Sequence, residues 1–262
     1  MEDATIPESH PRYWSLIKRR RIVEGYRRGI VVIDGLISHG RGEAIDYIIG
    51  EVTHQPALEA AKAATASLLT ASRPVISVNG NSAALAGGLI VELAAITGAV
   101  LEVNLFHWSA ERAYRIRDHL MELGAVSVLV PDGEEKVYME GLKSERGRVC
   151  RNGILAADTV LVSIEDGDRT EALRAAGKRV LAIDLNPFSR TAQRANVTIV
   201  DEIERALSNM IRLSRELRDE KKEELLRIVE CFDNALNLSE MIGIIRDRLG
   251  LMAGLEGCED YD

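Results

Sequence analysis

RVLAIDLNPFSRTAQRANVTIVDE, residues Arg179–Glu202, is the stretch that decides the fold. Its first apolar run, Val180–Ile183, is typical of a strand buried on both faces, and the DLNP sequence after it predicts a turn. A second apolar run, Val197–Val200, ends where a helix is expected to begin. Ligands of open α/β sheets bind outside the carboxyl ends of the strands. The stretch therefore predicts two neighbouring rims of one ligand crevice, although two core strands joined by a solvated loop would give the same pattern.

Strand-like and helix-like patterns alternate upstream of this stretch. Helical patterns cover Ala83–Thr97 and Ser109–Leu123. Further apolar runs predict a strand beginning at Pro74 and strands at Val100–Val103, Val126–Val130 and Thr159–Ile164. Because strands and helices alternate, the sequence predicts an α/β fold with a Rossmann-like, doubly wound parallel sheet and right-handed crossovers.

Helical patterns without strands flank the predicted sheet. They divide the chain into an N-terminal helical segment (1–72) packed on the core, a Rossmann-like nucleotide-binding core (73–203) and a helical C-terminal extension (204–262). All three are expected to form one compact domain. Apolar residues on the last helices need a surface to cover, and a symmetric homodimer interface is the natural candidate.

Composition excludes several classes of partner. The 262 residues carry a formal net charge of −8, which argues against nucleic acid or an anionic membrane surface. The first ten residues lack the apolar core of a secretory signal, and no apolar run of transmembrane length occurs, so a cytoplasmic location is expected. Three scattered cysteines and five dispersed histidines suggest neither a disulfide framework nor a zinc site.

Basic residues before the sheet are candidates for holding an anion. The first helical pattern carries a dense run of Lys and Arg, which is either a solvated face or a source of phosphate ligands. Arg41 stands between Gly40 and Gly42, so the backbone can approach a ligand and the guanidinium can bind two phosphate oxygens at once. An exposed arginine at the glycine-rich start of a helix is the alternative.

Three other segments carry polar groups near predicted strand ends. The Asn79–Ser82 turn precedes a helix and can hold an anion, although it matches neither GxGxxG nor GxxxxGK[ST] and a plain βα turn is equally expected. The acidic Glu165–Thr170 segment can coordinate magnesium, receive an amine, or merely cap a helix. The polar segment Pro131–Asn152 is a candidate for a mobile active-site loop.

Six motifs carry a family resemblance in a fixed order: SHPRYWSLIKRRRIVEG, HGRGEAIDYIIGE, RPVISVNGN, EVNLFH, EDGDRTEAL and AIDLNPFSRTA. From about Ile6 to Ile203 the chain resembles the archaeal-type phosphopantothenate synthetases, which are 4-phosphopantoate–β-alanine ligases of coenzyme A biosynthesis. The resemblance implies a homodimer with a Rossmann-like core. It also implies ATP-dependent condensation of phosphopantoate with β-alanine through an acyl-adenylate, with release of AMP and pyrophosphate.

The resemblance also implies site residues. At Glu202 the chain departs from the family pattern, in which an amide commonly stands. We hypothesise that Arg41 and Asp168 are catalytic, with Asp168 orienting the amine, and that Mg²⁺ bridges the phosphates. Asn79, Asn81 and Arg169 are hypothesised to bind phosphopantoate. The positions expected to contact ATP are Arg19, Arg41, Asp184, Leu185, Asn186, Arg190, Thr191, Glu202 and Ile203.

Two other functions stay open. A sheet of this kind can serve an enzyme that uses a dinucleotide or a thiamine-type cofactor, but the missing glycine fingerprint counts against that class. A non-catalytic nucleotide-sensing module, whose helical tail engages a partner, is the second alternative.

Overall fold

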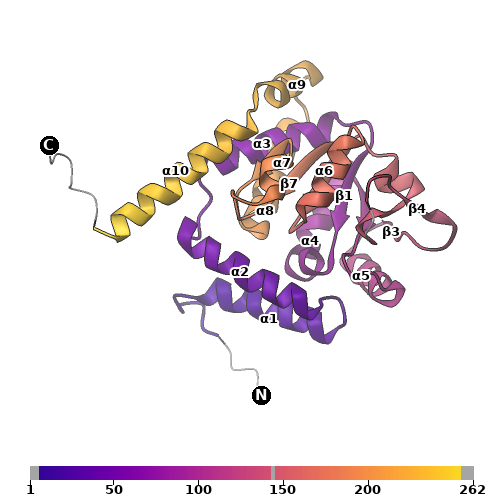
Figure 1. The fold of residues 1–262 in the computed structure, drawn as a ribbon, viewed down its shortest axis with the longest axis horizontal. Coiled ribbons are helices and arrows are strands. Elements are labelled where there is room, and N and C mark those ends of the chain that lie inside the picture. Colours follow the sequence, from indigo (N-terminus) through magenta and orange to yellow (C-terminus); the bar gives the residue numbers. More distant parts are fainter. Residues whose placement is uncertain (1–5, 143–144, 255–262) are drawn as a thin grey trace.

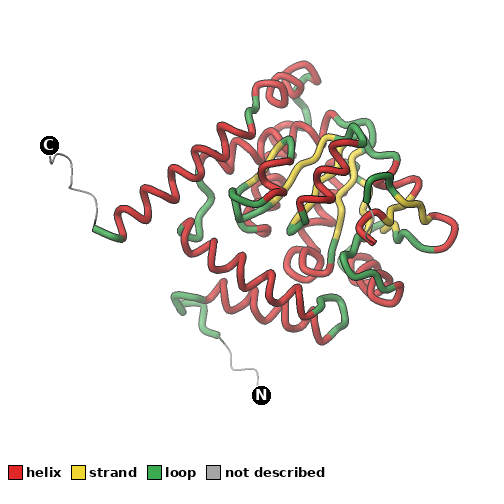
Figure 2. Tube along the Cα trace, in the orientation of Figure 1, coloured by secondary structure: helices red, strands yellow, loops and turns green. Residues whose placement is uncertain are grey.

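The computed structural model describes residues 6–142 and 145–254 (Figure 1). A sheet of six parallel strands lies at the centre of the molecule, with helices around it (Figure 2). The strands lie in the order β3-β2-β1-β6-β7-β8, which is the Rossmann order when they are counted in turn. This confirms the predicted fold class. The strands are β1 (Pro74–Val78), β2 (Val100–Val103), β3 (Val128–Leu129), β6 (Thr159–Ser163), β7 (Arg179–Ile183) and β8 (Val197–Ile199).

Both faces of the sheet are buried, which explains why its strands are continuous apolar runs. On β7, Leu181 and Ile183 join one core cluster, whereas Val180 and Ala182 join another on the opposite face. The first cluster includes residues of α3 (Gln55–Thr70), α4 (Gly80–Thr97), α5 (Ala110–Glu122) and α8 (Ile203–Leu217). The second includes Leu173 of α6 (Gly167–Ala175). The short helix α7 (Arg190–Arg194) connects β7 to β8.

Two N-terminal helices, α1 (Tyr13–Arg27) and α2 (Ile33–Ile49), lie side by side below the sheet in Figure 1. Helix α1 packs on α4, and α2 contacts α1 and the C-terminal helix α10 (Asn234–Met252). Gly40 and Gly42 lie within α2, although the sequence suggested that a helix starts there. The helix tolerates them because each internal glycine costs only about 1 kcal/mol, which packing against α1 can offset.

The segment Pro131–Asn152 forms more structure than a loop. Its described residues include an antiparallel pair, β4 (Lys136–Tyr138) and β5 (Arg148–Cys150), and short helical turns at Gly133–Glu135 and Glu145–Gly147. A further helical turn, Arg151–Leu155, begins at the end of the segment. Within this pair Arg148 is buried, and its guanidinium lies 4.0 Å from the centre of the Trp108 ring. The segment is therefore anchored to the core through charged as well as apolar side chains.

The C-terminal helices are α9 (Lys222–Cys231) and α10 (Asn234–Met252). Helix α10 packs against α2, α3 and β8, and its C-terminal end extends away from the sheet (Figure 1). Its far end exposes Leu249, Leu251 and Met252.

Helix α4 is the one helix in the described part of the chain that is long and apolar enough to cross a membrane. It packs against α8, α1 and α5, and Ile90 and Leu93 belong to the core. A core helix passes the same test of length and composition, so α4 carries no argument for a membrane span.

Candidate active site

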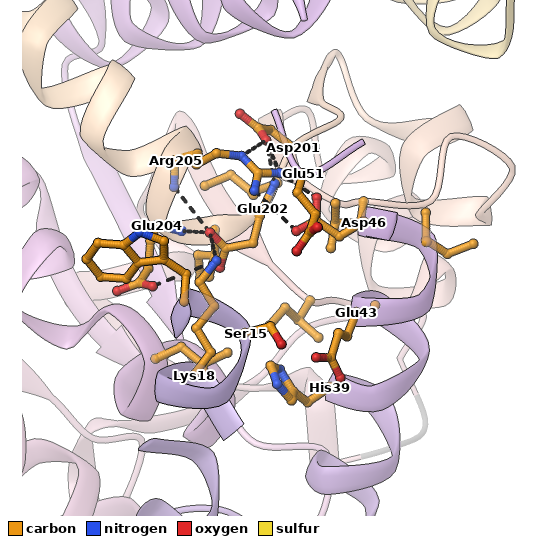
Figure 3. A pocket seen from close by; sticks show the side chains of 18 of the residues that line it. Ser15, Lys18, His39, Glu43, Asp46, Glu51, Asp201, Glu202, Glu204 and Arg205 are labelled. Atoms are coloured by element: carbon orange, nitrogen blue, oxygen red, sulfur yellow. Dashed lines mark hydrogen bonds and ion pairs between the residues drawn. The ribbon is translucent and has the colours of Figure 1, made fainter. Parts of the chain in front are cut away.

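A cavity of about 1290 Å³ lies where α1 and α2 meet the carboxyl ends of β6, β7 and β8 (Figure 3). Small-molecule sites usually occupy about 300–1,000 Å³. The cavity therefore has room for a nucleotide and part of a second substrate. Its lining combines apolar side chains from α1, α4 and α8 with cations and carboxylates from α1, α2 and the start of α8.

The structure brings together most of the positions proposed to contact ATP. These lining residues come from α2, from the turn after β7 and from the start of α8. A Cβ atom placed on Gly42 would lie 3.5 Å from Leu185, so α2 directly faces the turn after β7. The predicted positions that line the cavity are Arg41, Asp184, Leu185, Asn186, Glu202 and Ile203.

Asp184 organises the turn after β7. Its carboxylate accepts a hydrogen bond from the backbone N–H of Asn186 at 2.9 Å and another from the Ser189 hydroxyl. Burial raises the pKa of Asp184, whereas the hydrogen bonds from Ser189 and Asn186 act in the opposite direction. The Asn186 side-chain oxygen in turn accepts from the backbone N–H of Phe188 at 3.0 Å, so these bonds fix the turn from which Asn186 lines the cavity.

Glu202 holds two elements at once. Its Oε2 atom caps α8 by accepting from the backbone N–H groups of Glu204 at 3.0 Å and Arg205 at 3.3 Å. The Lys18 Nζ atom lies 2.9 Å from the same oxygen, as the dashed lines in Figure 3 show. The carboxylate that replaces the expected amide thus joins α1 to the start of α8.

Arg19 does not line the cavity but contacts a residue that does. Its Nη2 atom is 2.8 Å from Oε2 of Glu43, and Glu43 lines the cavity while Arg19 does not. Burial opposes the ionisation of Glu43, but hydrogen bonds from Arg19 and Tyr47 outweigh it and lower the pKa of Glu43. The structure therefore places Arg19 as a partner of an ionised carboxylate at the cavity.

The α6–α7 region places three predicted residues outside the cavity lining. Arg190 is exposed and pairs with Asp168 at 2.7 Å, and Asp168 is exposed as well. Thr191 is buried and donates to the backbone carbonyl of Glu165 at 2.9 Å. Glu165 itself lines the cavity, so Thr191 supports its rim from behind. Direct contacts of these three residues with substrates stay predictions.

The side chains of the residues hypothesised to bind phosphopantoate form hydrogen bonds or ion pairs with other residues of the protein. Asn79 caps α4 and donates to the carbonyl of Ser163 at 2.7 Å, and Asn81 donates to the carbonyl of Gly35 at 2.8 Å. Arg169 is fully buried; it forms an ion pair with Glu165 and donates to the Ser77 hydroxyl at 3.1 Å. None of the three lines the cavity. Their binding of substrate stays a hypothesis, whereas the structure shows that they connect neighbouring elements of the fold.

Sequence reasoning missed an ion-pair network at the cavity. The Arg205 guanidinium lies 2.5 Å from Asp46 and 2.8 Å from Asp201, and Thr53 also donates to Asp201. Despite burial of Arg205, the two carboxylates raise its pKa. The i, i+4 spacing of Asp201 and Arg205 is a local signal for one of these pairs. The Asp46 partner on α2 leaves no such signal.

Lys18 and His39 were also missed as site residues. Lys18 stood within a run of cations whose members looked equivalent, and His39 looked like one of several dispersed histidines. Both line the cavity, from α1 and α2 respectively. His39 and Glu43 are one helical turn apart, a spacing that would have placed them on one face had residues 39–43 been recognised as helix.

Comparisons with known proteins identify the family of the chain. The family model for phosphopantothenate/pantothenate synthetase matches residues 56–248. The 4-phosphopantoate–β-alanine ligase of Thermococcus kodakarensis is 50% identical over 249 residues, which cover 95% of each chain. The enzyme of the same name from Methanosarcina mazei is 48% identical over 252 residues, covering 96% of this chain and 98% of that one. The chain therefore belongs to the phosphopantothenate/pantothenate synthetase family.

Proposed function

We propose that this chain is an ATP-dependent ligase that condenses (R)-4-phosphopantoate with β-alanine to give 4′-phosphopantothenate, AMP and diphosphate. The observation that carries the proposal is the single cavity shared by Arg41, the Asp184–Asn186 turn and the Glu202–Ile203 step. The Asp184–Asn186 turn and the Glu202–Ile203 step follow the carboxyl ends of neighbouring parallel strands, where nucleotides bind in α/β sheets, and Arg41 lies on α2, which faces that turn. The names of the relatives support the choice of acid and amine.

The proposed chemistry has two steps. The carboxylate of phosphopantoate attacks the α-phosphorus of ATP and releases diphosphate, which leaves an acyl-adenylate. The amine of β-alanine then attacks the activated carbonyl carbon, and AMP leaves. The protein contributes mainly by positioning the reactants and neutralising charge. Arg41 is assigned to the phosphates, Asp184 and Asn186 to the ribose or base, and the backbone at Ile203 to the nucleotide.

Mg²⁺ is proposed to accompany ATP. No group of three or more His, Cys, Asp or Glu side chains suited to a metal ion occurs within residues 6–142 and 145–254. In the cavity, the carboxylates of Glu43 and Glu202 are paired with Arg19 and Lys18. Mg²⁺ typically keeps several waters and binds substrate phosphates with one or two carboxylates. The donor set therefore fits an ion that enters with the nucleotide, where it would neutralise phosphate charge.

The decisive experiment supplies ATP, phosphopantoate and β-alanine together and measures the nucleotide product. We expect AMP and diphosphate in amounts equal to the amide formed, and no ADP. Formation of ADP would indicate acyl-phosphate chemistry and contradict the adenylate. Binding of ATP without consumption of any substrate would favour the nucleotide-sensing module. Omission of β-alanine is the control, because turnover to the amide then stops.

A homodimer in the cytoplasm, without nucleic-acid or membrane partners, is part of the proposal. The exposed apolar side chains at the far end of α10 and Leu236 near its start support a protein partner surface. Light scattering at several protein concentrations tests the dimer. The division into 1–72, 73–203 and 204–262 is also proposed, and limited proteolysis that cuts near residues 72 and 203 would support it.

A further inference from the structure

His39 lines the cavity, and its ring nitrogens form no hydrogen bond among the described residues. The Nε2 atom is buried and has no hydrogen-bond partner, and no hydrogen bond to the Nδ1 atom occurs among the described residues. Histidines elsewhere in the described chain are engaged: His54 contacts the carbonyl of Ile49 at 2.9 Å, and His119 contacts Arg28 at 3.2 Å. A buried polar atom without a partner calls for an explanation, and here the ring borders a substrate cavity.

The groups around His39 set its protonation state. Glu43 on α2 and Glu202 at the start of α8 favour the imidazolium, while Lys18 and Arg19 on α1 disfavour it. Burial of the ring is the largest influence and lowers the pKa of His39 below its ordinary value. The ring is therefore neutral at pH 7 and has a lone pair available. In Figure 3 it lies beside Glu43 and faces the space between α1 and α2.

We propose that His39 is the base that takes a proton from the β-alanine nitrogen as the amide bond forms, an assignment that rests on the proposed ligase function. Because Nε2 is covered, Nδ1 is the nitrogen that can accept a proton from a group in the cavity. The Nε2–H tautomer satisfies this requirement, since it leaves the lone pair on Nδ1. Glu43 and Glu202 then stabilise the imidazolium that results.

The proton balance of this step is as follows. The ammonium of β-alanine first loses one proton to water, which frees the nitrogen lone pair. The amine attacks the acyl-adenylate carbonyl, and a C–N bond forms while the carbonyl π electrons move to oxygen. The intermediate collapses, the bond from carbon to the phosphate oxygen breaks, and AMP leaves with that electron pair. His39 accepts the second nitrogen proton and returns it to water before the next turnover.

The test separates the two half-reactions in the full-length protein. Hydroxylamine attacks acyl-adenylates without catalytic help, so hydroxamate formed from ATP and phosphopantoate reports adenylation alone. We expect H39Q to form hydroxamate within about twofold of the wild-type rate but to lose about 100-fold in the β-alanine-dependent rate. H119Q is the matched control, because burial also lowers the pKa of His119 and that ring lies outside the cavity lining. It should keep both activities.

The pH profile and a rescue experiment complete the test. Burial lowers the pKa of His39 from the ordinary value of 6.5, so the wild-type β-alanine step should lose its base catalysis at a pH below 6.5, and H39Q should lack this limb. Added imidazole should restore the step in H39A. An unchanged β-alanine rate in H39Q, or equal loss of hydroxamate and amide without imidazole rescue, would overturn the assignment. Absence of hydroxamate from the wild-type protein would instead refute the ligase proposal on which it rests.

Discussion

The ammonium of Lys18 lies 2.9 Å from the Glu202 carboxylate and thereby ties α1 to the turn that starts α8. Both side chains are largely buried, with exposed fractions of 13% and 9%. Removing one member of a buried ion pair leaves the other charge without compensation. Lys18→Met should therefore lower the free energy of unfolding by about 3 kcal/mol in urea denaturation. The double variant K18M/E202Q should recover much of this loss, because it removes both charges.

Lys221→Met is the control for this pair, because Lys221 is exposed at the start of α9. It should leave the unfolding midpoint nearly unchanged. A Lys18→Met protein as stable as the wild type would show that water screens the pair in solution.

Arg41 is exposed within the cavity on α2, opposite the turn after β7. Loss of a group that stabilises transition-state charge typically costs about 2–4 kcal/mol. Arg41→Ala should therefore reduce kcat/KM for ATP by about 10²–10³-fold while the unfolding free energy changes little. Steady-state kinetics with ATP varied at saturating phosphopantoate and β-alanine measures this. Arg27→Ala, an exposed arginine of α1 that pairs only with Glu24 in the described structure, should retain wild-type kinetics.

Much of the fold could be predicted because both faces of the sheet are buried. Each strand is then a continuous apolar run, and the polar residues that follow mark its carboxyl end. This pattern alone placed Asp184 and Asn186 in a turn at the end of a strand, and the family resemblance added their expected contact with ATP. The parallel order of the strands followed from the alternation of strands and helices. Only the family resemblance predicted that Arg41 and Glu202 contact the same nucleotide.

The rest depended on contacts that leave no local pattern. Asp46 and Arg205 are separated by 159 positions, and only folding brings α2 against α8. Charged side chains are expected at the surface, so the burial of Arg169 against Ser77 and Glu165 could not be anticipated. The two glycines around Arg41 suggested that a helix starts there, but α2 already begins at Ile33, because its tertiary contacts offset the low helix propensity of glycine.

Glu102 is a buried carboxyl on β2 that should make stability depend on pH. It accepts from the backbone N–H groups of Cys150 at 3.0 Å and Ile154 at 2.6 Å. Burial raises the pKa of Glu102 to about 7, and these hydrogen bonds only partly oppose the rise. The folded protein therefore holds a proton that the unfolded chain releases above pH 4.5.

The stability that Glu102 contributes is thus complete below pH 4.5 and is lost as the pH rises through 7. The difference over this window is about 3 kcal/mol, at 1.36 kcal/mol for each pKa unit. Urea denaturation at pH 5, 6, 7 and 8 should show this loss relative to Glu102→Gln, whose side chain does not titrate. Parallel pH profiles for the two proteins would mean that Glu102 stays ionised throughout.

Gly80 and Gly88 both lie on α4 but have different surroundings. A Cβ atom on Gly80 would overlap the backbone carbonyl oxygen of Ile30, whereas one on Gly88 would meet nothing within 4 Å. Gly80→Ala should therefore lower the unfolding free energy by about 1–3 kcal/mol through steric strain. Gly88→Ala should raise the unfolding free energy by up to about 1 kcal/mol, because alanine has a higher helix propensity than glycine at an exposed position within a helix.

The steric clash in Gly80→Ala should also change the geometry of the cavity. Ile30 lies in the connection between α1 and α2, and these helices carry Lys18 and Arg41. Displacing the connection at Gly80→Ala should therefore also weaken ATP binding, which titration calorimetry can measure at a temperature where the variant is folded. Gly88→Ala should bind ATP as the wild type does, because its new methyl group meets no atom within 4 Å. Equal ATP affinity in both variants would show that the α1–α2 pair is positioned independently of the turn after β1.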